Sequence, residues 1–483
     1  MAKSIKRNYV YSTLYNVLMV ISPLITAPYT ARVLEADGIG AVSFAASIVA
    51  YFGLFANMGT GSYAQREISY VRDDPEKRSI VFWETQILRM INTSIALVVY
   101  LSFVLLYAKS YRAIFLVFTI NIFSTACNVS WFLTGLEEFG KIALRNIAVR
   151  LIDVVFVFMF VKSKSDAALY AFGYSFFSIA AAMVMWKYIP AYVHKPDFKS
   201  LHPFRNMKTI LSLFVPGIAV QVYTVLDKTM IGIFTEGTLE NGYYEQSLKI
   251  SNAVLPLVVS LAGVISPRIG YLFGKNDHEQ INAYMYRSYN FVLFLSIPLC
   301  LGLIGVSGNF VPWFFGPGYE KVAGLMKISS LLIIIIGLHN ATGGQYLIPT
   351  KRQNLYTRAV TIGAIVNFSM NIVFIRIYQS YGAIIASVLA EAIIIAVEFY
   401  YIHEEISLGR IIASGKNYYI AGGTMLAVLL FMNAKFTPSI IHTFTMVFTG
   451  AAIYISLLFI LRDKFFLEYS AKPIAFLKRK FSR

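Results

Sequence analysis

Residues 22–52 read SPLITAPYTARVLEADGIGAVSFAASIVAYF, and this stretch contains the junction of two long apolar runs. The first run ends at Arg32 and the second begins near Gly38, so only a few residues separate them. Followed outward, the runs cover 9–32 and 38–65. Each is long enough to cross the hydrocarbon core of a bilayer, which takes about 20 apolar residues. We therefore expect two membrane-spanning helices joined by a very short turn.

The same pattern continues along the whole chain of 483 residues. Hydrophobic residues make up 57% of it and charged residues 14%, with a mean hydropathy of +0.62. Soluble domains have about 25% charged residues, so the composition excludes an ordinary soluble protein. We predict an all-α polytopic membrane protein with about fourteen transmembrane helices. The further predicted spans are 80–107, 112–135, 139–161, 166–190, 209–234, 243–270, 285–308, 321–349, 355–376, 380–402, 416–434 and 438–461.

Lys and Arg gather in alternate connections between these spans. With the N-terminus in the cytoplasm, 29 of the 42 Lys and Arg residues fall on the cytoplasmic side and 9 on the opposite side. Connections rich in Lys and Arg stay in the cytoplasm, so we predict that both termini are cytoplasmic. This placement accounts for most of the net charge of +17 and leaves no signal for nucleic-acid binding. The first residues run straight into the first span without a small-residue cleavage site, so we expect no cleaved signal peptide.

An internal repeat indicates how the spans are organised. Residues 34–70 and 238–274 align without gaps at an offset of 204, and Gly38 falls on Gly242. The second predicted span aligns with the eighth, and both run in the same direction. Such parallel repeats are related by an axis along the membrane normal. We predict two pseudo-symmetric six-helix bundles around a central cavity, then two extra helices and a basic cytoplasmic tail. The predicted parts are 1–206, 207–403, 404–462 and 463–483.

Basic residues inside or at the ends of spans are the first candidates for a binding site. A charge at the bilayer centre costs about 2.5–3.5 kcal/mol on insertion scales and normally faces a cavity or a partner. Lys228 either attracts an anionic substrate group or forms a structural ion pair. Lys249 either lines the same cavity or pairs with Glu245, four residues earlier. Arg32 either binds a phosphate, to which guanidinium is suited, or anchors its span at the headgroups.

Three more arginines complete the basic set. Arg89 lies roughly three turns into its predicted span. Arg66 and Arg268 end two spans at the cytoplasmic mouth, where they either receive an anionic headgroup or extend to the interface as an ordinary anchor. The firmest cavity candidates in the whole set are Arg32, Lys228 and Lys249. Because all three are basic, we expect an anionic cargo.

Two acidic residues are candidates for ion coupling. Asp227 precedes Lys228, and Glu391 lies mid-span with Glu398 seven residues later on the same face. Glu391 either titrates with a coupling ion or pairs with a basic residue. His339 either shuttles protons or is a hydrogen-bonded packing residue.

Motifs of soluble enzymes and metal sites do not occur in the sequence. CxxC, HExxH, GxSxG and Walker patterns are missing, and both cysteines fall inside predicted spans. The predicted outer loops are also too short for a catalytic domain. We therefore expect no enzyme activity, no metal and no cofactor.

Five motifs together resemble the Wzx-type polysaccharide repeat-unit flippases. Those belong to the multidrug/oligosaccharidyl-lipid/polysaccharide superfamily, with the MATE exporters and the lipid II flippases. The resemblance covers nearly the whole chain. The motifs are the stretch quoted above, LDKTMIG (226–232), GYYEQSLKI (242–250), FFGPGYE (314–320) and GGQYLIPTKRQ (343–353).

The resemblance implies a flippase in the bacterial cytoplasmic (inner) membrane. It would move undecaprenyl-pyrophosphate-linked oligosaccharide from the inner to the outer leaflet by alternating access, for capsule, exopolysaccharide or O-antigen biosynthesis. The family's cavity lies on helices 1, 2, 7 and 8, which here carry Arg32, Lys228, Lys249 and Arg268. The implied partners are this cargo, membrane lipid, and a polysaccharide polymerase with chain-length and export machinery. The alternative is a MATE-like cation-coupled antiporter of drugs or small molecules, for which Asp227 and Glu391 would be the anchors.

Overall fold

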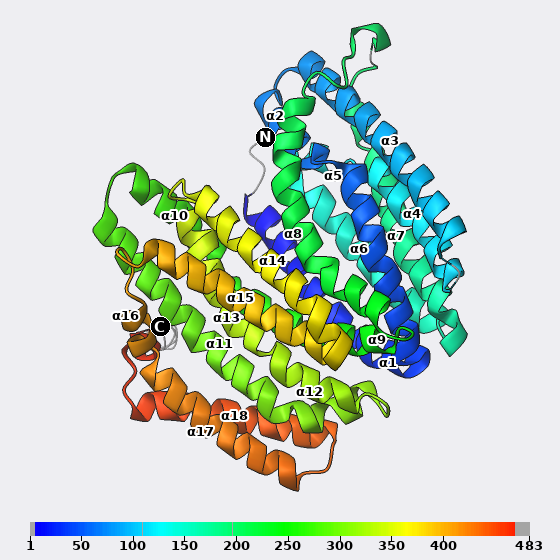
Figure 1. Cartoon of the computed structure of the whole chain (residues 1–483). Coiled ribbons are helices and arrows are strands. Elements are labelled where there is room, and N and C mark those ends of the chain that lie inside the picture. Colours follow the sequence, from blue (N-terminus) through cyan, green and yellow to red (C-terminus); the bar gives the residue numbers. More distant parts are fainter. Residues whose placement is uncertain (1–4, 109, 196, 469–483) are drawn as a thin grey trace, which may run out of the picture. The chain divides into compact units, whose positions relative to one another are not determined.

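The computed structural model in Figure 1 describes residues 5–108, 110–195 and 197–468 of the chain. Most of the described residues are helical, and none of them lies in a strand. Ten helical stretches of the described chain are long and apolar enough to cross a membrane. Each of the fourteen predicted spans also coincides with helix. The all-α polytopic fold is therefore confirmed, and the number of fourteen crossings stays a prediction.

Two compact units make up the chain, Met1–Glu245 and Gln246–Arg483. The bundles expected from the repeat, 1–206 and 207–403, stay a prediction. The predicted basic tail, 463–483, lies largely outside the described residues. Helices of the first unit are α1 (Ile5–Asn57), α2 (Thr60–Tyr70), α3 (Pro75–Leu106), α4 (Arg112–Cys127), α5 (Ser130–Gly135), α6 (Phe139–Phe160), α7 (Ala167–Trp186), α8 (Met207–Phe234) and the start of α9 (Leu239–Val259).

The second unit contains the rest of α9 and a series of long helices (Figure 1). Within it, α14 packs along α15, and α11 packs against α17 and α18. These helices are α10 (Ala262–Gly274), α11 (His278–Phe315), α12 (Glu320–Ser329), α13 (Leu331–His339), the π-helix η4 (Asn340–Leu347), α14 (Gln353–Tyr378), α15 (Ser380–Ile402), α16 (Leu408–Ser414), α17 (Lys416–Lys435) and α18 (Ile440–Ile460).

The two apolar runs quoted at the outset form one long element, α1, that bends at a single residue. Glu35 has φ 56° and ψ 177°, outside the helical region, and separates the two helical segments. The expected short turn is therefore present. The second segment ends at Asn57, earlier than the predicted end at residue 65. Met58 (φ 41°) and Gly59 (φ 72°) have positive φ there, which breaks the helix before α2.

The start of α9 crosses α1 at a point where only glycine fits. A Cβ on Gly40 would lie 1.7 Å from the carbonyl oxygen of Thr238, and one on Gly242 would lie 1.8 Å from that of Ala36. Small residues let membrane helices approach this closely. The hydroxyl of Thr238 donates to a carboxylate oxygen of Asp37 at 2.7 Å. This crossing fixes the beginning of α9 beside the bend of α1.

Candidate functional site

A break between α4 and α5 gives the site its polar wall. Because α4 ends at Cys127, its last carbonyl groups lack the usual N–H donor four residues later, and that of Thr125 accepts only a long backbone hydrogen bond of 3.4 Å from Asn128. The amide of Gln86 donates to the carbonyl of Ala126 at 2.7 Å. One turn later on α3, Nη2 of Arg89 donates to the carbonyl of Thr125 at 2.6 Å. Two side chains of α3 thus bind the end of α4, whose partial negative charge favours a cation.

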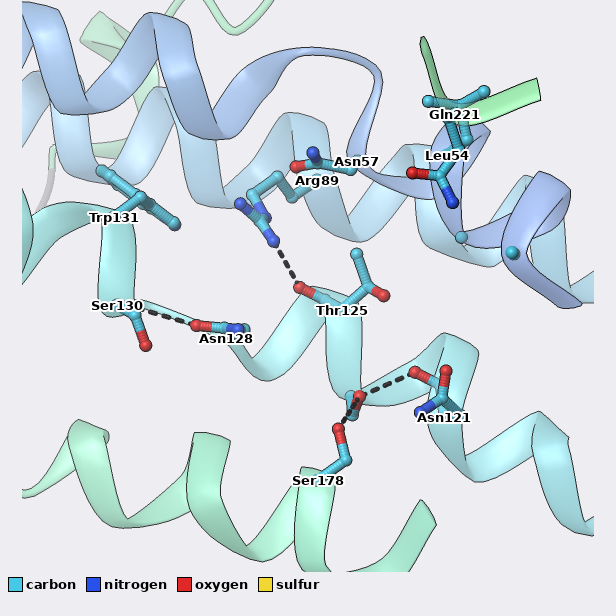
Figure 2. A pocket seen from close by; sticks show the side chains of 13 residues that line it. Leu54, Asn57, Arg89, Asn121, Thr125, Asn128, Ser130, Trp131, Ser178 and Gln221 are labelled. Atoms are coloured by element: carbon cyan, nitrogen blue, oxygen red, sulfur yellow. Dashed lines mark hydrogen bonds between the residues drawn. The ribbon is translucent and has the colours of Figure 1, made fainter. Parts of the chain in front are cut away.

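A cavity of about 460 Å³ lies beside this break, entirely within the first unit. Figure 2 shows the side chains that line it. Its walls come from α1, α3, α4, α5, α7 and α8. Arg89 is the charged residue of the lining, and it is 4% exposed. The uncharged polar side chains of the lining include Asn57, Asn121, Asn128, Ser130, Ser178 and Gln221.

The charge of Arg89 has no carboxylate partner among the described residues. The cavity lining contains no Asp or Glu, and no ion pair of the described chain includes Arg89. Its Nε also has no hydrogen-bond partner in the described part of the protein. A buried charge without a partner is costly. An arginine placed this way at a polar cavity is suited to an anion, and guanidinium matches phosphate bidentately.

The other lining groups suit a polar, hydroxylated ligand. Amide and hydroxyl side chains both donate and accept hydrogen bonds, so they can match the hydroxyl groups of a sugar. In the cavity, the hydroxyls of Ser124 and Ser178 are 3.0 Å apart, and the amide of Asn128 accepts from the backbone N–H of Ser130 at 2.9 Å. The cavity therefore combines one positive charge with a neutral polar lining.

Most of this lining was not among the residues singled out from the sequence, although a signal for it exists. Asn121, Ser124, Thr125 and Asn128 recur at the spacing i, i+3, i+4 and i+7. That spacing places them on one helix face, and inside an apolar run it indicates a polar wall. Of the predicted basic residues, Arg89 alone lines this cavity in the described structure.

Lys228 forms an ion pair, which was the structural alternative considered for it. Its Nζ lies 2.6 Å from Oε2 of Glu245, and the two side chains are 27% and 22% exposed. The hydroxyl of Ser43 on α1 also donates to that oxygen, at 2.8 Å. The neighbouring Asp227 accepts a hydrogen bond of 2.5 Å from the hydroxyl of Tyr244. The start of α9 is thus joined to both α1 and α8.

We predict that the Lys228–Glu245 pair stabilises the first unit. Lys228→Glu or Glu245→Lys alone should lower the thermal stability of the detergent-solubilised protein, because two like charges then share one site. The free energy of unfolding should fall by less than about 3–5 kcal/mol, which is typical for breaking a fully buried pair, because both side chains are partly exposed. The double variant Lys228→Glu/Glu245→Lys should recover most of it in a double-mutant cycle. Strictly additive losses would contradict the pairing.

The remaining basic candidates lie apart from the Arg89 cavity. Arg32 is exposed, next to the bend of α1. Arg66 contacts its neighbour Glu67 at 3.0 Å. In the second unit, the exposed Arg268 stacks over the ring of Tyr271, with its guanidinium carbon 5.3 Å from the ring centre. Their roles in binding stay predictions.

The other second-unit candidates are more enclosed. Lys249 is half-buried, and Glu391 is buried on α15. Seven residues after Glu391, Glu398 is fully buried, and one of its oxygens lies 3.1 Å from Nδ1 of His339. The structure thus brings together His339 and Glu398, which the sequence left as separate observations.

Comparisons with known proteins agree on a family and a fold. Residues 5–273 match the model of a family described as polysaccharide biosynthesis protein. A proposed O-antigen transporter of Escherichia coli (strain K12) is 21% identical over 404 residues, which cover 81% of this chain and 95% of that protein.

Solved structures with the same fold include two kinds of transporter. Lipid II flippase MurJ in an inward closed conformation is similar with a TM-score of 0.70 and 15% identity, over 94% of this chain and 99% of that one. An inward-facing multidrug resistance MATE family transporter has a TM-score of 0.62 and 13% identity, over 86% of this chain and 95% of that one. At these identities the likeness concerns the fold alone.

Proposed function

Because this chain belongs to the polysaccharide biosynthesis protein family, we propose that it is a flippase for lipid-linked oligosaccharides. The cargo is an undecaprenyl-pyrophosphate-linked repeat unit, which moves from the inner to the outer leaflet for O-antigen, capsule or exopolysaccharide assembly. The name of the Escherichia coli relative supports a surface polysaccharide as the end product.

The Arg89 cavity is the observation that carries this proposal. A lipid-linked sugar has two polar parts, a pyrophosphate and hydroxyl-rich rings. The cavity offers a positive charge without a carboxylate partner among the described residues, together with neutral amides and hydroxyls. Arg89 binds the pyrophosphate, while the amide and hydroxyl lining contacts the first sugar. The polyprenyl tail stays in the lipid.

Transport follows from alternating access of this site to the two leaflets. Two repeated bundles rocking against each other expose the cavity to one side and then the other. The charged headgroup also responds to the membrane potential, since one charge moved across 100 mV is worth about 2.3 kcal/mol. Both termini lie on the cytoplasmic side of the inner membrane, in line with the distribution of Lys and Arg. A polymerase and export machinery act on the product.

The MATE-like drug antiporter is the rival function, and the fold admits it. A site for organic cations needs an acidic anchor, whereas the lining of the Arg89 cavity carries no Asp or Glu. The buried Asp227 accepts a hydrogen bond from Tyr244. The positive charge of Arg89 in the cavity therefore favours an anionic cargo.

Complementation tests the proposed function. A bacterial strain that lacks its own repeat-unit flippase accumulates lipid-linked oligosaccharide and loses surface polysaccharide. Expression of this protein, with several repeat-unit pathways in turn, should restore the surface polymer and clear the accumulated intermediate. No restoration with any pathway, together with resistance to cationic drugs on expression, would favour the antiporter.

A further inference from the structure

His339 and Glu398 form a buried acid–base contact in the second unit. Glu398 is 0% exposed, and its Oε1 lies 3.1 Å from Nδ1 of His339, which is 15% exposed. That distance is within hydrogen-bonding range, but the alignment is poor. Neither carboxylate oxygen of Glu398 has a well-formed hydrogen bond within the described residues. His339 is therefore the group on which the charge of Glu398 depends.

Three other carboxylates of the protein instead form ion pairs with arginine, which keeps its positive charge at physiological pH. Glu84 contacts Arg205, Asp153 contacts Arg150, and Glu405 contacts Arg352 at 2.6 Å. Burial acts to raise the pKa of Glu405, but hydrogen bonds from Arg352 and Tyr346 outweigh it and lower that pKa. Glu405 thus stays charged over the physiological range, because its partner does not titrate there. Glu398 differs, since imidazole gains and loses its proton near neutral pH.

The local backbone is built around this carboxylate. Directly after His339, α13 changes into the π-helix η4. π-Helical turns are rare and occur frequently at functional sites. Within η4, a Cβ on Gly343 would lie 2.6 Å from Oε1 of Glu398 and 2.6 Å from the ring of Tyr356. The glycine therefore leaves the space that the carboxylate occupies.

The groups around His339 and Glu398 do not neutralise a negative charge on Glu398, so the pair needs a bound proton to be neutral. The titratable side chains that interact with it are Glu391 of α15, Tyr356 of α14 and Tyr289 of α11. The ring of Tyr356 also stacks on His339 with centroids 5.6 Å apart. Described contacts give the pair no Lys or Arg. With His339 neutral, an ionised Glu398 would be a lone buried anion near another carboxylate, and that arrangement is strongly disfavoured.

We propose that the contact of His339 with Glu398 is the proton-binding site that couples this transporter to the proton gradient, a proposal that rests on the proposed function. The pair takes up one proton, and the carboxyl group of Glu398 carries it, because a neutral pair avoids placing two charges in a fully buried site. Losing it leaves a buried anion that η4 and α15 can stabilise only by moving apart or by admitting water. Proton uptake and release thus change how η4 packs on α15.

Proton binding is tested directly on the purified full-length protein in lipid nanodiscs. Infrared difference spectra between low and high pH detect the protonated carboxyl group without any cargo. We expect a pH-dependent carboxyl band in the wild type that Glu398→Gln removes and that His339→Gln shifts in pH. Glu404→Gln, an exposed position just after α15, is the matched control and should retain the band. Glu391→Gln distinguishes the two buried acids and should retain it as well.

Coupling is tested with the same variants in liposomes. The probe is a synthetic polyprenyl-pyrophosphate trisaccharide with a fluorescent tag. An imposed pH gradient should accelerate its translocation by the wild type and by Glu404→Gln. Glu398→Gln should lose this acceleration while it keeps translocation without a gradient. A carboxyl band that persists in Glu398→Gln, or acceleration equal to that of the wild type, would overturn the proton site.

The two proposals fail separately in these experiments. If the pair titrates but the wild type moves no lipid-linked sugar, the proton site stands and the flippase proposal fails. If the wild type moves the sugar and Glu398 carries no titrating proton, the flippase proposal stands and the proton site fails.

Discussion

Arg89→Gln should abolish most transport while the protein still folds and reaches the membrane. Glutamine keeps a hydrogen-bond donor for the carbonyl of Thr125 but removes the positive charge from the cavity. Losing one partner of a desolvated charge pair costs about 2–5 kcal/mol. The apparent affinity for a pyrophosphate cargo should therefore fall on the order of a hundredfold. The measurement is complementation of a flippase-deficient strain, with the amount of each variant in the membrane matched.

Two further variants separate charge from structure in this experiment. Arg89→Lys restores the charge without the planar guanidinium, so it should recover part of the activity. Arg112→Gln removes an exposed arginine at the start of α4 in the same unit and should transport normally. Normal transport by a well-folded Arg89→Gln would show that the cargo binds elsewhere.

Gly242→Ala should have the largest effect on stability. Its new methyl group would meet the carbonyl oxygen of Ala36 at 1.8 Å, so the backbones of α1 and α9 must separate. Inserting a methyl group into a well-packed site typically costs about 1–3 kcal/mol, and here the obstructing atom is backbone rather than a movable side chain. In Gly40→Ala, the new methyl group would meet the carbonyl oxygen of Thr238 on the other side of the crossing, so this variant should lose a similar amount of stability. Thermal unfolding in detergent, followed by size-exclusion chromatography, measures both.

Gly423→Ala is the control for these glycines. It lies in α17, and an added Cβ there meets nothing within 4 Å. In an exposed helix, Gly→Ala stabilises by up to about 1 kcal/mol, so this variant should unfold at the same or a higher temperature. Equal unfolding temperatures for Gly242→Ala and wild type would contradict the close crossing of α1 and α9.

The fold was predictable from the sequence because membrane helices are long, apolar and free of competing patterns. Apolar runs predicted the helices, and the fold neighbours confirm the fold. The resemblance to Wzx-type flippases is confirmed by the family match and the O-antigen transporter relative. The break at Met58–Gly59 was missed, since a hydropathy pattern does not register a change of backbone dihedral angle at one or two residues. Helix existence follows from composition, whereas helix ends depend on local backbone geometry.

The site was less predictable because charge alone does not say where a side chain points. Lys228 was one of several basic candidates in the sequence, and only the fold shows that Glu245 lies within 2.6 Å of it. Arg89 had no distinguishing motif, and its importance rests on a cavity whose walls come from six helices. The spacing of polar residues from Asn121 to Asn128, at the end of α4, was the one feature of the sequence that could have predicted that wall. Pairings between distant helices, such as His339 with Glu398, require the three-dimensional arrangement.

Translocation by the purified protein tests the central claim most directly. The protein is reconstituted in liposomes with a fluorescent polyprenyl-pyrophosphate trisaccharide, and a membrane-impermeant quencher reports how fast the labelled lipid changes leaflet. We expect wild type and Arg112→Gln to move the lipid well above protein-free liposomes, and Arg89→Gln to remain near that background. Wild-type movement equal to protein-free liposomes, or equal rates for wild type and Arg89→Gln, would contradict a flippase whose cargo binds at the Arg89 cavity.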